Sequence, residues 1–563
     1  MTVRAQAAES GAMSLETQVV IVGGGPVGLA LANDLGWRGL DCVLVERATG
    51  LPDFPTCESV NARTMEHFRR WGIAQAVRDA GFPPDVPRSV RFMTRILGHE
   101  ILCFHRPSNR EFQRELGELT PEAGIWCPRM MFEPVMRARL DEHACVRVLA
   151  GWEVTGFDDD DRAVTVRAVD TQSGKAVVIH ADYLAACDGA ASDTRKRLGI
   201  PMQGTFAEGH NVTVYFESPA LREALADKPG VMMDIVNADG RANLSAVDGA
   251  DRWRLIQHVG ADEPLDPERR VRLHLGRDLP FTVIGARAWA GHRVVAERMR
   301  AGRVFLVGDA AHLLWPRGGF GMNTGIGDAV DLGWKLQATL ARWGGPGLLD
   351  SYEEERRPVA QRNVDEAASN RAEDAAVPVS PRLEDDSPEG QAERDAVARV
   401  IREKRAKEWN SLGIQLGYRY DPSRICVPDG TKAPPDSPTD YVPGTWPGSR
   451  APHAWLAPGR SLLDGYGDGF VLVSTGPARP GAAALVQAAQ ARGLPLRIEA
   501  VDDPAIARLY QRPLVLVRPD GHVAWRGDSA PADAAELVDR IRGAWPDAAT
   551  PGAASQRQEA GAA

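Results

Sequence analysis

The sequence predicts an α/β fold in three parts: a Rossmann-like nucleotide-binding domain, a β-sheet domain inserted into it, and a smaller C-terminal α/β domain. An apolar run at 18–22 precedes a glycine-rich turn, a helical stretch of small residues and a second apolar strand ending at Glu46. That order is typical of a βαβ unit. Residues 205–295 contain mostly strand-like runs, and strands again alternate with a helical stretch from about residue 451.

Apolar pattern and composition divide the chain into six expected segments. They are a disordered leader at 1–16, the nucleotide-binding domain at 17–196 and 296–372, the inserted domain at 197–295, a charge- and proline-rich connector at 373–450, the C-terminal domain at 451–547, and a disordered tail at 548–563. Whether part of 85–118 joins the inserted sheet stays open. The connector is expected to contain a helix near 392–409.

Composition excludes several classes of protein. The chain has 66 Lys and Arg against 76 Asp and Glu, a net charge of −10, which argues against a basic nucleic-acid surface. No apolar run approaches the roughly 20 residues of a membrane helix, and the first sixteen residues lack the apolar core of a secretion signal. Seven scattered cysteines without a CxxC pair indicate reduced thiols in a cytoplasmic protein, with no disulfide frame and no metal site.

The first glycine turn carries a nucleotide-binding pattern. Gly23, Gly25 and Gly28 form GxGxxG between strand and helix, with Pro26 at the start of the helix. The glycines permit a tight turn, close approach of a pyrophosphate and close helix–strand packing. Glu46 lies 23 residues after Gly23, near the spacing of an acid that binds ribose hydroxyls. The pattern predicts a bound dinucleotide and leaves FAD or NAD open.

A second glycine-rich segment distinguishes between these cofactors. Residues 303–336 contain the motif residues Gly308-Asp309-Ala310-Ala311-His312, Pro316, Gly318-Gly319, Gly321-Met322-Asn323 and Asp328. A closing Ser351-Tyr352-x-x-Glu355-Arg356-Arg357-Pro358 follows, and Asp188-Gly189 lies between the two glycine turns. Together these motifs resemble the single-component, FAD-dependent aromatic hydroxylases of the para-hydroxybenzoate and phenol hydroxylase superfamily, across almost two-thirds of the chain.

The resemblance implies roles for individual residues. Asp309 would accept hydrogen bonds from the ribityl hydroxyls, and Asp188 would contact FAD and NAD(P)H. The helix beginning near Gly319 would direct its positive end at the flavin N1/C2=O edge. His312 is expected to make structural hydrogen bonds. The glycine-rich loop would place its backbone against the flavin ring, and Pro316 would lie near the flavin. Gly319, Gly321, Met322 and Asn323 would contact FAD.

Two positions depart from the family pattern. Many relatives carry an arginine where this chain has Thr56. The positive charge of that arginine would here have to come from Arg47, Arg63 or Arg129. Arg129 itself stands where many relatives have a glutamine, four residues before the usual glutamate, here Glu133.

Glu58 occupies a position where phenol-hydroxylase-like sequences place an acid beside the substrate. A carboxylate there would take a phenolic proton; the alternative is a surface acid in a loop.

The C-terminal segment resembles the thioredoxin-like domain of the phenol hydroxylase branch. No cysteine follows Cys426, which excludes thiol–disulfide chemistry there. A packing or dimerisation module is expected, so a homodimer stays open.

The implied function is an NAD(P)H- and O2-dependent monooxygenase that hydroxylates a phenolic or polycyclic aromatic molecule through a flavin C4a-hydroperoxide. NADH and NADPH are not distinguished. The inserted domain would bind substrate beside Trp315 and Pro316. The candidate lining residues are Met232, Met233, Ile235, Trp253 and Trp289, with ordinary core packing as the alternative for each, so only the region is predicted.

Three alternatives remain. The same scaffold supports Baeyer–Villiger insertion or epoxidation, and a flavin-bearing binding module without turnover is a non-enzymatic alternative. A flavin halogenase is disfavoured, since the GWxWxIP segment typical of many halogenases is missing.

Overall fold

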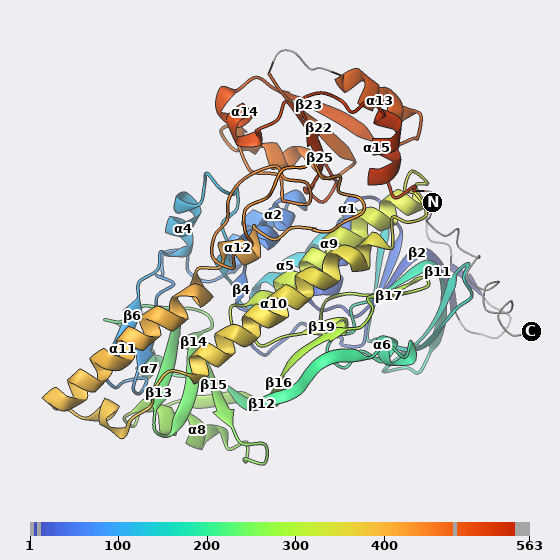
Figure 1. The fold of residues 1–563 in the computed structure, drawn as a ribbon. Coiled ribbons are helices and arrows are strands. Elements are labelled where there is room, and N and C mark those ends of the chain that lie inside the picture. The colour runs from blue at the N-terminus through green and yellow to red at the C-terminus, as the bar shows by residue number, and fades with distance from the viewer. Residues whose placement is uncertain (1–4, 8–12, 477–480, 546–563) are drawn as a thin grey trace, which may run out of the picture.

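A nine-stranded sheet organises the first domain of the computed structural model, which describes residues 5–7, 13–476 and 481–545 (Figure 1). Its parallel centre has the order β18-β11-β2-β3-β8, and β1, β17 and the β9–β10 hairpin pair antiparallel around it. The strands are β1 (Ala5–Ala7), β2 (Met13–Val22), β3 (Cys42–Glu46), β8 (Val146–Ala150), β9 (Trp152–Asp159), β10 (Val164–Asp170), β11 (Ala176–Ala186), β17 (Arg300–Ala301) and β18 (Val304–Leu306).

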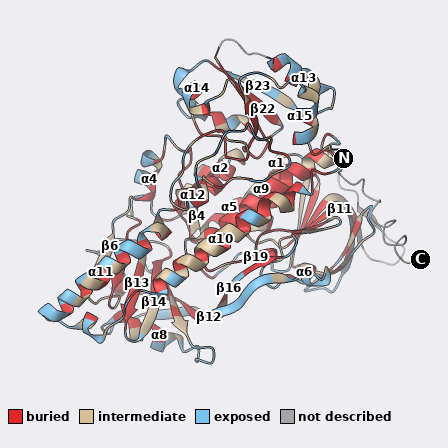
Figure 2. Ribbon diagram, viewed as in Figure 1, coloured by how far each residue is buried: buried red, intermediate tan, exposed pale blue. Residues whose placement is uncertain are grey.

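The central strands are apolar without interruption because both faces of this part of the sheet are covered: α1 contacts β2, β3 and β8, and β9 of the hairpin contacts β3. Val19, Val20 and Ile21 of β2 are fully buried. Figure 2 shows α9 buried along almost its whole length, and α9 packs against α1 and α10. The helices of the domain are α1 (Pro26–Trp37), α2 (Ala62–Arg70), α3 (Ala74–Ala80), α5 (Arg129–Leu140), α6 (Asp193–Arg197), α9 (Phe320–Leu340) and α10 (Ser351–Ala375).

A second sheet of eight strands has the order β19-β16-β12-β15-β14-β13-β5-β6. Its two longest strands pair from Met202 opposite Ala296 to Glu217 opposite Thr282, and they connect it to the first domain. β5 and β6 come from the segment 85–118 and complete the sheet. The elements are β5 (Val90–Met93), β6 (Glu100–Phe104), α4 (Asn109–Glu115), β12 (Met202–Glu217), α7 (Pro219–Ala224), β13 (Met232–Asn237), β14 (Gly240–Ala246), β15 (Arg252–Val259), α8 (Pro267–Leu275), β16 (Thr282–Ala296) and β19 (His312–Leu313).

The connector forms part of the second domain's wall. Its helix α11 (Pro388–Trp409) places Val397 and Ile401 against Phe92 and Ile101 of the sheet. The short helix α12 (Leu412–Gln415) follows, and extended chain then leads to the C-terminal domain.

The C-terminal domain contains a four-stranded sheet of order β23-β22-β24-β25, in which only β22 and β23 are parallel. It lies over the ends of α1 and α9 (Figure 1), where Phe470 packs edge-on against Trp334 and Trp343. Its elements are β20 (Trp455–Ala457), β21 (Arg460–Ser461), β22 (Phe470–Thr475), α13 (Ala482–Gln490), β23 (Leu496–Val501), α14 (Pro504–Tyr510), β24 (Leu514–Val517), β25 (Val523–Gly527) and α15 (Ala534–Ile541).

The expectation of a disordered leader over 1–16 is wrong for part of that segment. β2 already begins at Met13, and β1 pairs with it, Ala5 opposite Leu15. Leu15 is fully buried in the core, so apolar contact extends the strand beyond its evident apolar run. The expected tail at 548–563 lies outside the described residues.

Within the described ranges, no helix has both the length and the apolar character needed to cross a membrane. The same ranges contain no group of three or more His, Cys, Asp or Glu side chains placed to hold a metal ion.

Candidate active site

The turn between β2 and α1 is closed so tightly that only glycine fits. Gly23 has a φ of +101°, and a Cβ built on it would lie 2.4 Å from the carbonyl oxygen of Cys187. A Cβ on Gly28 would lie 1.9 Å from the carbonyl oxygen of Gly23. α1 then begins at Pro26, and no side chain caps it. Its first N–H groups are therefore available to an anion.

Three further predicted cofactor residues surround this turn. Glu46 accepts hydrogen bonds from the N–H of Gly24 (2.5 Å) and of Ala48 (2.7 Å). Arg129 lies beside Gly25, with its Nη2 3.7 Å from where a Cβ would be, and its Nε donates to Glu133 (2.6 Å). Asp188 follows β11 next to Gly23; its Oδ2 accepts from the N–H of Thr194, while its Oδ1 is buried without a partner.

Two further arginines proposed for the positive charge differ from Arg129. Arg47 follows β3 and is exposed. Arg63 is buried at the contact with the C-terminal domain, where it donates to Glu66 (2.8 Å) and to the carbonyl oxygen of Asp520 (2.5 Å). Arg63 is therefore occupied by that contact. Arg129 remains the half-buried cation beside the turn.

The second glycine turn joins β19 to α9. Gly318 and Gly319 have φ values of +92° and +68°, and α9 begins at Phe320 without a side-chain cap. Asp309 follows β18 and opens into the same space. Desolvation by the surrounding protein raises the pKa of Asp309, and Coulombic interactions with His312 and Arg129 oppose that rise. Asp309 is exposed to the cavity, and an acceptor in this position suits a hydroxyl donor of a ligand.

Asn323, a predicted cofactor residue after this turn, is occupied by protein contacts. The amide of Asn323 donates to the carbonyl oxygens of Ser59 and Gly319 and accepts from the N–H of Asn61 and the hydroxyl of Thr64. It therefore fixes the start of α9 against the segment before α2.

His312 is fully buried, and its Nε2 lies 2.7 Å from Asp328, which also pairs with Arg356. This is the structural hydrogen bonding that the motif suggested.

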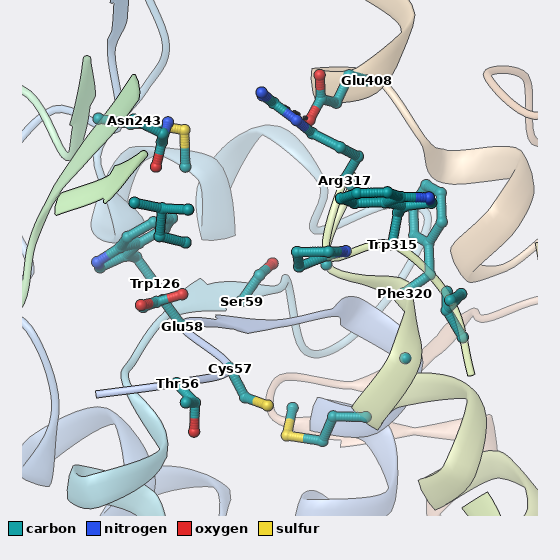
Figure 3. Close-up of a pocket in the computed structure, with 18 of the residues that line it drawn as sticks. Thr56, Cys57, Glu58, Ser59, Trp126, Asn243, Trp315, Arg317, Phe320 and Glu408 are labelled. Atoms are coloured by element: carbon teal, nitrogen blue, oxygen red, sulfur yellow. Dashed lines mark ion pairs between the residues drawn. The ribbon is translucent and has the colours of Figure 1, made fainter. Parts of the chain in front are cut away.

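A cavity of about 610 Å³ lies between the second glycine turn and the second sheet (Figure 3). Pro316, Gly319, Gly321 and Met322 line it together with Asp309. The sheet contributes Asn211, Thr213, Asn243, Arg254, Ile256, His258 and Trp289, and the connector contributes Trp409 to Leu412 and Gln415. Both domains and the connector therefore enclose one site.

Strand alternation decides which candidates face the cavity. Met232 and Trp289 line it, as expected. The expectation is wrong for Met233, Ile235 and Trp253, whose side chains belong to the apolar cluster on the other face of the sheet, with Leu221 of α7 and Val271 of α8.

Trp315 forms one wall and is 2% exposed. Its indole Nε1 donates to Glu208 (2.8 Å), and its ring meets Trp289 edge-on at 6.3 Å. A Cβ on Gly291 would lie 2.4 Å from the Trp315 ring, so close approach of β16 holds the indole in place.

Glu58 lies opposite this wall, beside Trp126 (Figure 3). It directly precedes β4 (Ser59–Val60), which pairs with β7 (Ile125–Trp126). Glu58 is 8% exposed and forms an ion pair with Arg254 of β15. Arg254 also donates to Ser245 (3.0 Å). The sequence offered no signal for this partner, which lies almost 200 residues away.

Arg317, also missed in the sequence, fixes the second glycine turn to the outer wall. Its guanidinium pairs with Asp374 of α10 (2.8 Å) and lies 3.9 Å from Glu408 of α11. Arg405 of α11 pairs with both acids and with Asp234 of β13. These groups are almost fully buried, so the charges compensate one another away from water.

The residues present fit FAD. The uncapped start of α1 suits the pyrophosphate, and that of α9 suits the electron-rich flavin edge. At Gly23, any side chain would clash with the protein backbone, so the turn is kept free of side-chain atoms. Asp188 Oδ1 and Asp309 are acceptors that the described protein leaves free for hydroxyl donors.

Comparison with known proteins agrees. A family model described as an FAD binding domain matches residues 16–367, and one described as the C-terminal part of aromatic-ring hydroxylases matches residues 444–548. The FAD-dependent monooxygenase apdD of Emericella nidulans is 34% identical, over 93% of this chain and 89% of its own length. The tetracenomycin A2 monooxygenase-dioxygenase of Streptomyces glaucescens is 31% identical, over 92% of this chain and 95% of its own.

Solved structures are similar over the same range. RebC soaked with chromopyrrolic acid and holding 7-carboxy-K252c is 40% identical, with a TM-score of 0.89 over 94% of this chain and 99% of that one. The flavin-dependent monooxygenase PieE in complex with FAD and substrate is 30% identical, with a TM-score of 0.85 over 94% and 99%. This chain therefore belongs to the family of FAD-dependent aromatic hydroxylases and is an FAD-dependent monooxygenase.

Proposed function

We propose that this monooxygenase uses NAD(P)H and O2 to hydroxylate a polycyclic, phenolic molecule in the cavity between the second glycine turn and the inserted sheet. The observation that carries the proposal is that one cavity is lined both by the flavin-binding loop, Pro316 to Met322, and by the aromatic side chains Trp126, Trp289 and Trp315. A ring bound there would lie between the flavin-binding loop and these aromatic side chains.

The size of the cavity favours an extended ring system. At about 610 Å³, it has the volume of a site for a drug-sized ligand. The names of the relatives point the same way: they include the tetracenomycin A2 enzyme and an aklavinone 12-hydroxylase of Streptomyces purpurascens.

Binding of FAD is assigned to the two turns. Gly23, Gly25, Pro26 and Gly28 would receive the pyrophosphate at the start of α1, with Arg129 beside it. Glu46 keeps both oxygens near the turn and can accept from a ribose hydroxyl in addition to two N–H groups, because a carboxylate offers about four acceptor positions. Asp188 and Asp309 would accept from hydroxyls, and Gly319 to Met322 would face the ring.

FAD held by these residues would supply the redox chemistry of NAD(P)H oxidation and oxygen transfer to the ring. The chain's own residues keep the site dry and oriented. Trp315, held by Glu208 and Gly291, and Trp289 cover one side with indole rings. Excluding water there favours oxygen transfer over loss of H2O2.

Glu58 is the acceptor for a phenolic hydroxyl. Its carboxylate lines the cavity, and the ion pair with Arg254 fixes its position. A phenol that donates to Glu58 becomes more electron-rich at the ring carbons, which is what an electrophilic oxygen requires. Epoxidation and Baeyer–Villiger insertion, by contrast, do not need that hydrogen bond.

The test is a substrate screen on the purified, FAD-loaded enzyme. Phenols and polycyclic aromatics are added with NADH or NADPH, and nucleotide consumption, H2O2 and the product's mass and NMR spectrum are measured. Accelerated consumption with a ring-hydroxylated product is expected for a polycyclic phenol. A lactone product would replace hydroxylation with Baeyer–Villiger insertion, and lack of stimulated consumption across the screen would contradict turnover.

A further inference from the structure

Five arginines line the cavity, and they fall into two groups. Arg254 pairs with Glu58, Arg317 with Asp374 (2.8 Å), and the exposed Arg287 lies 3.7 Å from Asp53. Arg88 and Arg106 have no acidic side chain within ion-pair distance in the part of the chain that the structure describes. In an otherwise acidic protein, this end of the cavity therefore holds two uncompensated positive charges.

The two guanidiniums come from neighbouring segments. Arg88 precedes β5 and Arg106 follows β6, where Pro87 and Ser108 form a bridge. The N–H of Arg106 also donates to the hydroxyl of Ser89 (3.4 Å). Both side chains thus belong to the far edge of the second sheet, away from the glycine turns of the first domain.

The protein holds both guanidiniums in place without neutralising them. Arg88 is 7% exposed; it donates to the carbonyl oxygens of Pro107 and Gly124 (both 3.2 Å), and the ring of Phe112 lies 3.9 Å from its Cζ. Its Nη2 is buried and has no acceptor among the described residues. Arg106 makes one side-chain hydrogen bond, from Nη2 to the carbonyl oxygen of Trp409 (2.7 Å).

Electrostatics agrees with this geometry. Burial lowers the pKa of Arg88 to about 9, with a further contribution from the charge of Arg106. Burial lowers the pKa of Arg106 to about 10. Glu115, the one acid that acts on both, is exposed on α4 and pairs with neither. A buried cation without a counter-ion is costly, and a ligand that brings the negative charge removes that cost.

We propose that Arg88 and Arg106 bind a carboxylate of the aromatic substrate, so that the enzyme acts on aromatic acids held with the carboxylate at the β5–β6 end and the ring toward Pro316. Guanidinium groups recognise carboxylates through paired, charge-assisted hydrogen bonds. Asn410 and Ser411 of the connector line the cavity as well and add polar groups. This inference deepens the proposed function and rests on it for the identity of the ring-binding site.

The experiment compares an acid with its neutral analogue. Binding of 6-hydroxy-2-naphthoate and of 6-hydroxy-2-naphthamide to the FAD-loaded enzyme is measured by isothermal titration calorimetry, without NAD(P)H. Because hydrogen bonds to charged groups are the stronger ones, the carboxylate is expected to bind about 10- to 100-fold more tightly than the amide. Equal affinities in the unmodified enzyme, or no binding of either compound, would overturn the proposal without needing any variant.

Variants then assign the effect to the two residues. Arg88→Gln and Arg106→Gln are each expected to reduce the carboxylate preference to about twofold or less, with the amide affinity unchanged. Arg110→Gln is the matched control, since it removes the same charge from α4, where Arg110 pairs with Asp85 in solvent; it should keep the full preference. A preference that survives both glutamine variants would contradict the assignment.

Two other results separate this inference from its alternatives. If Arg106→Gln raised KM for NAD(P)H and left the carboxylate preference intact, the guanidiniums would serve nucleotide phosphates, and the proposal would be wrong. Calorimetry records binding without turnover, so absence of hydroxylation would refute the proposed function while the carboxylate preference still stood or fell on its own.

Discussion

The two glycine turns serve one cofactor but need glycine for different reasons. In the turn at Gly23–Gly28, a Cβ would meet backbone atoms at 2.4 Å or less at both ends, so packing of β2, α1 and β11 demands glycine. At Gly321, the nearest atom to a Cβ would be 3.7 Å away on the flexible side chain of Leu314, and the residue lines the cavity. In the first turn, the packing of the protein therefore excludes larger residues. In the second turn, a larger residue at Gly321 would instead take space from the ligand in the cavity.

The largest effect is expected for Gly28→Ala. The added Cβ cannot fit 1.9 Å from the carbonyl oxygen of Gly23, so α1 must move away from β2. A loss of about 3 kcal/mol or more in stability and loss of the yellow FAD absorbance are expected. Gly25→Ala is the control for stability alone: its nearest neighbour, Arg129 Nη2, is 3.7 Å away, so the Tm of its apoprotein should stay unchanged. Full FAD content and an unchanged Tm in Gly28→Ala would refute the packing argument.

Asp309→Asn separates cofactor binding from stability. FAD affinity is expected to fall about tenfold through loss of a charge-assisted acceptor. Since the pKa of Asp309 is raised in the folded protein, ionisation opposes folding, and stability of the apoprotein falls as pH rises from the ordinary pKa through the raised one. The neutral variant should therefore have the higher apoprotein Tm at pH 8 and little advantage at pH 4. Thermal melts at both values check this; a lower Tm at pH 8 would contradict it.

Gly321→Ala is expected to leave the fold intact and disturb the chemistry. Alanine in the first turn of α9 adds up to about 1 kcal/mol of stability, while its methyl group enters the space beside the flavin. FAD content should match the unmodified enzyme and Tm should be equal or slightly higher, with a severalfold larger share of NAD(P)H oxidation yielding H2O2. Peroxide and product are measured together. Unchanged coupling would show that this position does not face the ring.

The smallest effect is expected for Glu46→Gln. The amide oxygen still accepts from the N–H of Gly24 or Ala48, so the turn keeps its shape. FAD affinity should fall about two- to fivefold through the weaker ribose contact, with peroxide yield unchanged. Fluorescence titration of the apoprotein with FAD measures it, and a loss as large as that of Gly28→Ala would mean that Glu46 supports the fold.

Local motifs made the first domain predictable. Gly23, Gly28, Glu46 and Asp309 lie in patterns whose spacing is fixed by one turn or one strand, so their positions follow from the sequence. The family model over residues 16–367 and the matching structures confirm the FAD-binding fold. The extension of β2 to Met13 was missed because its polar residues interrupt the apolar run.

The cavity was less predictable because its contacts are non-local. Glu58 was a candidate, but nothing in the sequence links it to Arg254, which reaches it only through the pairing of β12, β15 and β14. Met233 and Ile235 were placed in the lining although strand register turns them to the other face. Trp409 enters the site from a connector whose packing no local pattern indicates.

The docking of the C-terminal domain has a consequence for how this protein can be shortened or recombined. Arg518 of that domain lies between Glu355 of α10 (2.5 Å) and Asp331 of α9 (3.1 Å), and both acids are fully enclosed. A chain truncated before residue 451 would leave Lys335 as the cation facing both acids in that cluster. Truncation thus removes Arg518, a counter-ion of Asp331 in α9 and of Glu355 in α10. Chimaeras with related enzymes must therefore exchange Arg518, Asp331 and Glu355 together.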